Sequence, residues 1–375
     1  MSALCFEQKQ MATNALGCSM LEINLTNIVK NFKTLQSLCP SADVYPVLKA
    51  NAYGLGAIPI GAALERAGAK SFFIAYIGEA LALRQHLTEV DLYLLNGPYT
   101  TGWEKVCFEY NVIPVLNTYE TIKDWHAFAK SQGLPLRAAL HIDTGMRRLG
   151  LSAQELKHFL AVDFPYINWV LVMSHLACAD DFSHEMNEKQ RLNFEALHKY
   201  FPTTKFSLAN SPGIFLGQAY HYDVVRPGGS LYGHKPTGEG SPIISCITMK
   251  SQVLQIQHLE PGESVGYGCT FIAEKPTIIA TLGLGYADGL LRHLSGKDAY
   301  ALVNGQKAPF VGRVSMDLVT INITSIKDVA VGNWAVLMGG DEGAMMLDDV
   351  ARKVQTDSRD VLVGLGDRFN RIHTI

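Results

Sequence analysis

Between residues 44 and 226 the chain repeats short, continuous apolar runs, and longer segments with helical periodicity separate them. Continuous apolar runs of this length are typical of strands that are buried on both faces, as in parallel sheets. The runs predict eight strands, at residues 44–48, 72–75, 92–95, 113–116, 138–142, 169–173, 205–208 and 223–226. Eight strands with helices between them predict a (β/α)8 barrel of the TIM type over residues 1–240. A doubly wound open sheet is the alternative, because periodicity alone does not show closure.

Amphipathic helices fit the segments 26–37, 118–130, 152–161 and 189–200. Thr26 is placed to cap the first of these helices. Ser152 and Glu155 form the S-x-x-E pattern of a capping box at the start of the third.

The pattern changes at residues 235–242, where the turn-forming sequence KPTGEGSP predicts a linker. Strand-like segments follow at 244–257, 277–282, 319–323 and 333–338, with one clear helix at 347–354. We therefore predict a β-rich C-terminal domain over residues 241–375, built as a sandwich or a barrel. The first 20 or so residues are expected either to pack with that second domain or to be disordered.

The composition limits the classes of partner. With 375 residues, 48% hydrophobic and 18% charged, and a net charge of −3, the chain has neither the profile of a disordered protein nor that of a nucleic-acid-binding protein. Its seven scattered cysteines contain no CxxC pair, which argues against a disulfide framework and against a zinc or other metal site. Polar residues 7–10 interrupt any signal peptide, and no apolar run is long enough to span a membrane. We expect a soluble, cytoplasmic protein that acts on a small molecule.

Polar and glycine-rich loops follow the last two predicted barrel strands. The sequence after strand 7 is ANSPG, which contains Ser211, and the sequence after strand 8 is RPGGSLYG, which contains Gly228 and Gly229. Barrels commonly hold a phosphate with these two loops, and glycines let backbone N–H groups approach an anion. Either loop alone could be a tight turn, but the pair of them favours a phosphorylated ligand.

Basic residues follow other strands at the same edge. Lys49 comes directly after the first strand, Arg148 and His175 follow strands 5 and 6, and Arg226 ends strand 8. A single lysine or histidine in a loop is more often structural, whereas all four at one barrel mouth favour a site. An amine that is partly removed from water becomes nucleophilic and can form a Schiff base. Pyridoxal phosphate is the cofactor that combines a phosphate with this chemistry.

The second domain carries three further motifs, VGYGCTF, GLGYADG and GRVSMD. GLGYADG has neither the glycine spacing nor the βαβ context of a dinucleotide fingerprint. Tyr267 lies between two glycines in VGYGCTF, so it is either a packed aromatic on a bent strand or a phenol on an exposed turn. The residue pattern by itself favours packing.

From about residue 20 to its C-terminus the chain resembles the alanine racemases, which are fold-type III pyridoxal-phosphate enzymes. The motifs that carry the resemblance occur in the family's order: VLKANAYGLG, DTGMRRLG, MSHLACAD, ANSPG, VVRPGGSLYG, VGYGCTF, GYADG and GRVSMD. The resemblance implies racemisation of L- and D-alanine, with a role in supplying D-alanine for peptidoglycan. It also implies a head-to-tail homodimer whose active sites are shared between chains.

The resemblance implies two opposed bases. Lys49 would bind pyridoxal 5'-phosphate covalently and then act as the base on one face of the substrate. Tyr267 from the other subunit would act on the opposite face, with His175 connecting it to Arg226 by hydrogen bonds. Arg226 would face the pyridine nitrogen and keep it unprotonated.

Binding residues are implied by the same resemblance. Tyr53, Ser211 and the backbone of Gly228 and Gly229 would hold the phosphate. Arg148 would contact the cofactor's phenolic oxygen and the substrate carboxylate, and the backbone of Met316 would be a second carboxylate contact. Tyr286 would narrow the entrance.

Two positions depart from the family pattern. His141 stands where many relatives have a lysine that is often carbamylated, so Arg148 must be oriented in another way, by a chloride ion or a neutral side chain. Arg359 stands where relatives have a phosphate-binding tyrosine. Either the local alignment slips there, or the phosphate gains a cationic contact.

Three other activities are compatible with parts of this pattern. A racemase of broader specificity, accepting serine for example, differs only in its substrates. A fold-type III decarboxylase of basic amino acids also pairs a barrel with a β domain, although Tyr267 and Arg226 argue against it. A non-catalytic carrier of pyridoxal phosphate would be a barrel alone, and residues 243–375 argue against that.

Overall fold

The computed structural model describes residues 17–97, 100–340 and 342–375. These residues form two compact units. One contains residues 28–231 and 235–243, and the other contains the described residues up to 27, together with 232–234 and 244–375. The predicted boundary at residue 240 falls inside the 235–243 segment of the first unit. Most of the predicted N-terminal segment lies outside the described residues.

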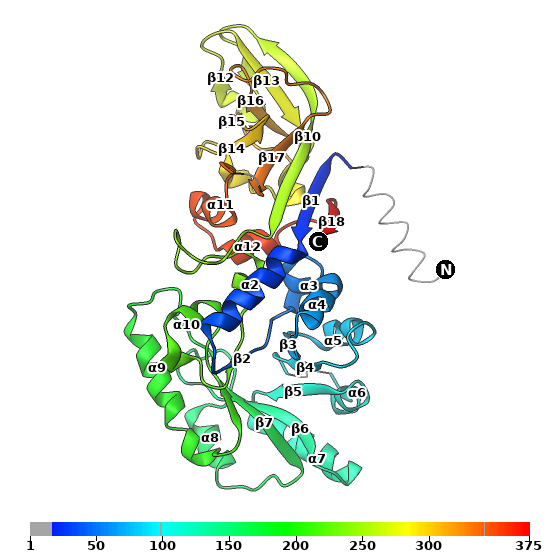
Figure 1. Ribbon diagram of the computed structural model, residues 1–375, viewed down its shortest axis with the longest axis vertical. Coiled ribbons are helices and arrows are strands. Elements are labelled where there is room, and N and C mark those ends of the chain that lie inside the picture. The colour runs from blue at the N-terminus through cyan, green and yellow to red at the C-terminus, as the bar shows by residue number, and fades with distance from the viewer. Residues whose placement is uncertain (1–16, 98–99, 341) are drawn as a thin grey trace, which may run out of the picture. The chain divides into compact units, whose positions relative to one another are not determined.

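Eight parallel strands form the centre of the first unit (Figure 1). Strands β3 to β8 make one sheet in chain order, and β2 pairs with β9. Parallel bridges at Val47–Phe73 and Asn210–Arg226 join the two groups, so the sheet closes into a barrel. The prediction of a TIM-type barrel is therefore confirmed, and the open-sheet alternative is wrong. The strands are β2 (Asp43–Val44), β3 (Ser71–Ile74), β4 (Asp91–Leu94), β5 (Val112–Leu116), β6 (Leu136–His141), β7 (Ile167–Met173), β8 (Lys205–Ser207) and β9 (Val224–Val225).

The barrel interior is filled by side chains from alternate positions of these strands. Phe73 and Tyr93 stack with ring centroids 4.9 Å apart, and Val115, Ala139 and Leu171 pack in the same buried cluster. The opposite faces of the strands are buried as well, as at Phe72 and Leu92. Burial on both faces explains why the strands are continuous apolar runs in the sequence.

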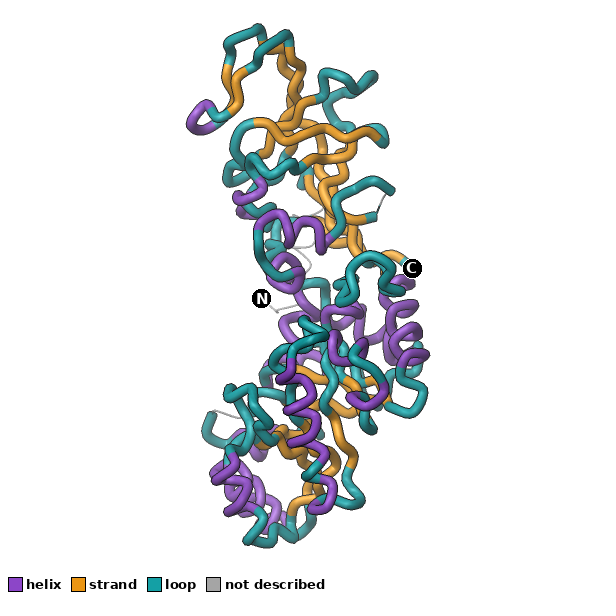
Figure 2. Tube along the Cα trace, turned by 90° about the vertical axis from the view of Figure 1, so that its left-hand side faces the viewer, coloured by secondary structure: helices purple, strands orange, loops and turns teal. Residues whose placement is uncertain are grey.

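Helices flank the barrel strands (Figure 2). The first helix begins at Leu25, and Asn24, not Thr26, caps it by accepting a hydrogen bond from the Asn27 N–H at 2.8 Å. The capping box of Ser152 and Glu155 is confirmed. The helices are α2 (Leu25–Leu38), α3 (Lys49–Tyr53), α4 (Ala57–Arg66), α5 (Ile77–Arg84), α6 (Trp103–Glu109), α7 (Tyr119–Gln132), α8 (Ala153–Phe159), α9 (Glu185–Glu195) and α10 (Ser211–Phe215), with short 3-10 turns at His198–Tyr200, Gln218–Tyr220 and Gly229–Tyr232.

The helix predicted at 189–200 is displaced. It begins four residues earlier, because His184 accepts a hydrogen bond from the Met186 N–H at 3.1 Å and so caps the helix as α9. It ends at Glu195, and the separate turn His198–Tyr200 follows.

The second unit is mainly β structure, as predicted. Its strands follow the order β13-β16-β15-β14-β17-β10, and β10 also pairs with β13, which closes a barrel. Strand β1 then pairs with β10, and β18 adds to β1. The strands are β1 (Ser19–Asn24), β10 (Ile247–Leu259), β11 (Ser264–Val265), β12 (Phe271–Ile272), β13 (Thr277–Leu282), β14 (Tyr300–Val303), β15 (Gln306–Val311), β16 (Val319–Asn322), β17 (Trp334–Gly339) and β18 (Asn370–Thr374).

The second unit contains one more helix than the sequence predicts. Helix α11 (Leu347–Val354) has the predicted bounds, and α12 (Ser358–Val363) follows it. Asp357 caps α12 by accepting the Arg359 N–H at 2.7 Å. Short 3-10 turns lie at Tyr267–Cys269, Tyr286–Asp288 and Arg292–Leu294. Across all described residues, no helix has the length and apolar character needed to cross a membrane.

Candidate active site

Lys49 lies at the mouth of the barrel, immediately before a backbone turn in the left-handed conformation. The preceding residue, Leu48, donates its N–H to the Phe73 carbonyl at 2.8 Å, which fixes the chain at the end of β3. The four residues after Lys49 all have positive φ, between 52° and 57° (Ala50, Asn51, Ala52 and Tyr53). Left-handed backbone costs roughly 1–2 kcal/mol for each residue that is not glycine. Such strain persists only where surrounding contacts enforce it, and it is frequent at functional sites.

A compact cradle of hydroxyl and backbone groups lies at the ends of β8 and β9. The Ser211 hydroxyl accepts hydrogen bonds from the backbone N–H groups of Gly228 and Ser230, at 2.9 and 3.2 Å. A Cβ on Gly228 would overlap the Tyr53 hydroxyl and displace that side chain, so the glycine lets the two groups lie close together. The Ser230 hydroxyl is fully buried and has no hydrogen-bond partner within the described chain. The hydroxyls of Tyr53 and Ser211 and a glycine backbone thus lie together, and such a set suits a phosphate.

Arg226 is buried beside this cradle, and its guanidinium donates to neutral acceptors. It contacts the Ser207 hydroxyl, the Ser174 carbonyl at 2.6 Å and Nδ1 of His175 at 3.3 Å. Burial lowers the pKa of Arg226 to about 9, so the group still carries its charge at neutral pH. A cation without a carboxylate among these partners is suited to face a ligand that accepts hydrogen bonds.

His175 is neutral in this setting. Burial and the charge of Arg226, with smaller contributions from Arg148, His141 and Lys49, hold its pKa well below the usual value. Arg226 can only donate to Nδ1, at 3.3 Å, and the Asn210 amide nitrogen lies 3.5 Å from Nε2. Because the charged donor is the closer one, we assign Nδ1 as the acceptor and the ring proton to Nε2. His175 therefore presents an N–H group at the barrel mouth.

His141 has the opposite tautomer, which Asn117 determines. The Asn117 amide nitrogen donates to the carbonyls of Leu95 and Val115, both at 3.0 Å, so its amide oxygen faces His141 Nδ1 at 2.7 Å. Nδ1 must carry the proton, and Nε2 keeps its lone pair. Burial, followed by Arg226, lowers the pKa of His141 to about 3. His141 is thus uncharged, and the orientation of Arg148 by a chloride ion or a neutral side chain stays a prediction.

Arg148 lies on the loop between Ile142 and Leu151. These two residues form a parallel bridge that closes the loop at its base. The Asp143 carboxylate organises this loop by accepting the N–H groups of Gly145 and Arg147 at 2.9 and 3.0 Å. Arg148 itself is exposed and lines a cavity bounded by α8 and α9. Its side chain is therefore near the mouth, and its electrostatic effect reaches both histidines.

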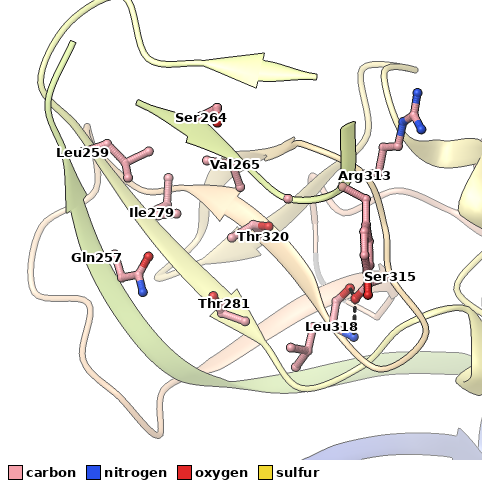
Figure 3. A pocket seen from close by; sticks show the side chains of 12 residues that line it. Gln257, Leu259, Ser264, Val265, Ile279, Thr281, Arg313, Ser315, Leu318 and Thr320 are labelled. Atoms are coloured by element: carbon pink, nitrogen blue, oxygen red, sulfur yellow. Dashed lines mark hydrogen bonds between the residues drawn. The ribbon is translucent and has the colours of Figure 1, made fainter. Parts of the chain in front are cut away.

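Tyr267 belongs to the other unit and is one of its most exposed aromatic residues. Its side chain is 72% exposed, so the prediction of a packed aromatic is wrong. The flanking glycines Gly266 and Gly268 have φ of 71° and 74°, which turns the chain outward between β11 and β12. Beside Tyr267 a cavity is lined by side chains of β10, β13 and β16, with Arg313 and Ser315 on one side (Figure 3).

Tyr286 and Met316 lie on two adjoining loops of the same unit. The Tyr286 N–H donates to the Ser315 carbonyl, and the Ala287 N–H donates to the Met316 carbonyl, both at 3.0 Å. Both predicted side chains are substantially exposed. The two loops are also joined by Arg368, which binds Asp288 through two bonds of 2.8 Å and Asp317 through one of 2.7 Å.

Arg359 is engaged within its own unit. Its guanidinium forms an ion pair with Asp357, with Nε 2.6 Å from Oδ1. This contact lowers the pKa of the Asp357 carboxyl. A phosphate contact by Arg359 stays a prediction.

Models of the alanine racemase family match nearly the whole chain. The N-terminal domain model matches residues 23–236, and the C-terminal domain model matches residues 246–373. The chain belongs to the alanine racemase family. It is 39% identical over 366 residues to a catabolic alanine racemase of Mesorhizobium japonicum, which covers 96% of this chain and 94% of that protein. It is 40% identical over 360 residues to the alanine racemase of Rhodospirillum rubrum, with coverage of 94% and 95%.

A solved structure gives the same result. The alanine racemase of Bartonella henselae with covalently bound pyridoxal phosphate superposes with a TM-score of 0.89 at 36% identity, covering 96% of this chain and all of the other. Among the described residues, no group of three or more histidine, cysteine, aspartate or glutamate side chains is arranged to hold a metal ion.

Four residues near the predicted site were missed by the sequence analysis. Asn117 could have been found, because it is the first polar residue after β5, at the same sheet edge as Lys49. Ser230 adjoins the glycine pair that was identified. Glu79, whose carboxylate accepts the Ala50 N–H at 2.6 Å, and Arg368 gave no comparable signal. Charged residues in a helix and near a chain end are usually solvated.

Proposed function

We propose that this protein interconverts L- and D-alanine with pyridoxal 5'-phosphate bound covalently to Lys49. The observation that carries the proposal is the barrel mouth, where Lys49, the cradle around Ser211 and the buried Arg226 lie at adjoining strand ends. Membership of the alanine racemase family and the covalently bound pyridoxal phosphate of the Bartonella henselae structure support it.

The cradle fits the phosphate of this cofactor. Tyr53 and Ser211 would donate their hydroxyls, and the backbone of Gly228 and Gly229 would approach closely because neither residue has a Cβ. The buried hydroxyl of Ser230 would find its partner there. When bound, pyridoxal phosphate supplies an electron sink that makes the Cα–H of an amino acid acidic.

Arg226 would face the ring nitrogen of the cofactor. Because a guanidinium donates hydrogen bonds and does not accept them, the nitrogen would stay unprotonated. This limits how far electrons are drawn into the ring, and so it disfavours side reactions such as transamination. Arg148 and the backbone of Met316 would bind the substrate carboxylate, and Tyr286 would narrow the entrance.

Two bases on opposite faces would exchange the Cα proton. Lys49 would act on one face, and Tyr267 of the partner subunit would act on the other, so that one proton leaves as another arrives and the centre inverts. The exposure of Tyr267 supports a role outside its own unit. The Nε2–H of His175 would stabilise the phenolate form of that tyrosine.

The proposal includes a head-to-tail homodimer in the cytoplasm that makes D-alanine for peptidoglycan. Exposed apolar side chains accompany Tyr267 on the second unit, at Ile272, Met316 and Leu318. Surfaces of this kind favour a protein partner. The catabolic name of the Mesorhizobium japonicum relative makes alanine breakdown the competing physiological role.

Deuterium exchange at Cα, followed by proton NMR in heavy water with added pyridoxal phosphate, tests the reaction. We expect L-alanine to lose its Cα–H signal and D-alanine to form, and Lys49→Ala to abolish both changes. A panel of L-amino acids that includes serine, lysine, ornithine and arginine measures specificity. Carbon dioxide release from the basic amino acids, without racemisation of alanine, would instead identify a decarboxylase.

A further inference from the structure

The backbone that carries Lys49 is held from a neighbouring helix. The left-handed run of residues 50–53 begins immediately after the lysine. Its strain is opposed by hydrogen bonds within the turn, such as that from the Gly54 N–H to the Ala50 carbonyl at 2.8 Å, and by contacts from neighbouring elements. Elements α3, β3 and α5 lie side by side at this point (Figure 1). Glu79, the third residue of α5, reaches the run with its side chain.

The Glu79 carboxylate accepts three backbone N–H groups from two separate segments. Its Oε1 accepts the Ala50 N–H at 2.6 Å, while Oε2 accepts those of Ala75 and Tyr76 at 2.7 and 3.1 Å. The last two bonds belong to the start of α5 and are those expected of a glutamate near a helix N-terminus. The bond to Ala50 is not part of that cap, because it crosses to the lysine turn.

Lys49 is therefore fastened on both sides. The residue before it donates to the end of β3 through Leu48, and the residue after it donates to Glu79 through Ala50. A backbone held at both neighbours restricts the directions in which the lysine side chain can leave the sheet edge. Hydrogen bonds to an ionised acceptor are about twice as strong as neutral ones, which suits them to hold a strained turn.

We propose that Glu79 is a positioning residue that holds the lysine turn in the conformation needed for covalent capture of the cofactor. This inference rests on the proposed function, because it assumes that Lys49 is the residue that binds pyridoxal phosphate. Glu79 itself touches neither cofactor nor substrate. It acts through the backbone of Ala50.

Glu79→Gln is the informative variant. A glutamine keeps the size of the side chain but replaces one acceptor oxygen by an NH2 donor, which cannot bind an N–H group. Either the lysine turn or the start of α5 must then lose its hydrogen-bond acceptor, so the link between them is broken. Glu79→Asp is the second variant, since its carboxylate is one methylene shorter and can cap α5 without reaching Ala50.

Glu155→Gln is the matched control. Glu155 is also the third residue of a barrel helix, and its carboxylate caps α8 at Ser152 with a bond of 3.0 Å. It also reaches the neighbouring Tyr119 N–H at 3.4 Å. It thus joins two adjacent segments of the barrel, as Glu79 does, but neither of them carries Lys49.

The experiment measures how fast cofactor-free protein binds pyridoxal phosphate covalently, from the visible absorbance after mixing. We expect Glu79→Gln and Glu79→Asp to slow capture by about tenfold or more, as the loss of one charge-assisted hydrogen bond predicts. Glu155→Gln should stay within about twofold of the wild type, since its bonds leave the lysine turn unchanged. Hydrogen exchange at the Ala50 amide should become faster in both Glu79 variants and stay unchanged in the control.

The outcomes separate the two proposals. If the wild type never binds pyridoxal phosphate covalently, the proposed function fails. If the wild type binds it and either Glu79 variant that folds captures it at the wild-type rate, the positioning role is overturned. Equal slowing in Glu79→Gln and Glu155→Gln would also overturn it, because that result would indicate a general effect of weakening a helix cap.

Discussion

The two histidines at the barrel mouth have the same charge and opposite proton positions. Arg226 makes Nδ1 of His175 an acceptor, and Asn117 makes Nδ1 of His141 a donor. Each neutral ring is therefore a fixed dipole whose direction its neighbour sets. The barrel mouth also contains the basic residues Lys49, Arg148 and Arg226. Their positive charges disfavour protonation of the two imidazole rings.

Nitrogen-15 NMR of histidine-labelled protein tests this assignment. We expect His175 as the Nε2–H tautomer and His141 as the Nδ1–H tautomer at pH 7, with each signal assigned by its absence in the variant His175→Gln or His141→Gln. Asn117→Ala should release the His141 ring and mix its two tautomers, because the acceptor at 2.7 Å is lost. Titration of either ring between pH 6 and 8 would contradict the assignment.

The depressed pKa of His141 also predicts how stability depends on pH. The pKa is about 3 in the folded protein and about 6.5 when unfolded, so between these values the unfolded state binds the extra proton. Stability is then lost as the pH falls below about 6.5, by roughly 1.4 kcal/mol for each pH unit from this group. Urea unfolding at pH 7, 6, 5 and 4 should show a shallower loss in His141→Gln than in the wild type. Parallel pH profiles would rule out this contribution.

At the scale of elements, one arginine side chain adds to the backbone hydrogen bonds that join two loops of the second unit. The Arg368 guanidinium bridges Asp288, which is buried, and Asp317, which is exposed, and so it joins the loops of Tyr286 and Met316. Planar bidentate pairing is a property of arginine that lysine lacks.

Arg368→Lys should therefore lower the stability of this unit and disturb the loops. We expect a loss of about 1–3 kcal/mol in the free energy of unfolding, since a buried carboxylate loses part of its hydrogen bonding. The KM for alanine should rise because the two loops carry the proposed entrance residues. Arg352→Lys is the control, because its 3.0 Å pair with Asp349 is exposed and within one helix, and such pairs contribute little. Similar effects of the two substitutions would argue against a special role for Arg368.

Strands and helices differed in how well the sequence predicted them. All eight barrel strands were predicted, because a strand that is buried on both faces is apolar at nearly every position and is visible as a continuous run. Helix α12 was missed, since six residues give too short a periodic pattern. The left-handed turn after Lys49 was also missed, because alanine carries no local signal for positive φ and the conformation is imposed by contacts such as that of Glu79.

The sequence predicted the positions of the site residues better than their exposure or protonation. Residues directly after strands, such as Lys49 and Ser211, were recognisable from position. The exposure of Tyr267 was not, because a glycine-flanked aromatic suits a bent, packed strand equally well. Tautomers depend on partners far apart in sequence, so neither His141 nor His175 could be assigned before the fold was known.

At the scale of the whole molecule, a shared site predicts complementation between inactive chains. Lys49→Ala removes the lysine from its own barrel, whereas Tyr267→Phe removes the tyrosine that a chain would give to its partner. Refolding the two inactive variants together should restore about one quarter of the wild-type activity, because half of the dimers are mixed and each mixed dimer has one intact site. Each variant refolded alone is the control. A mixture as inactive as its parents would place both bases in one chain.

The pairing of β18 with β1 has a consequence for how the protein is made. Strand β1 is synthesised before any of the barrel, yet its neighbours in the sheet are β10 and β18, and β18 ends one residue before the C-terminus. The barrel sequence is thus an insertion between the first strand of the second unit and the rest of it. A ribosome-bound chain can complete the barrel before β1 is paired on that side, but the edge of the other sheet formed by β18 is completed only after residues 370–374 have left the ribosome.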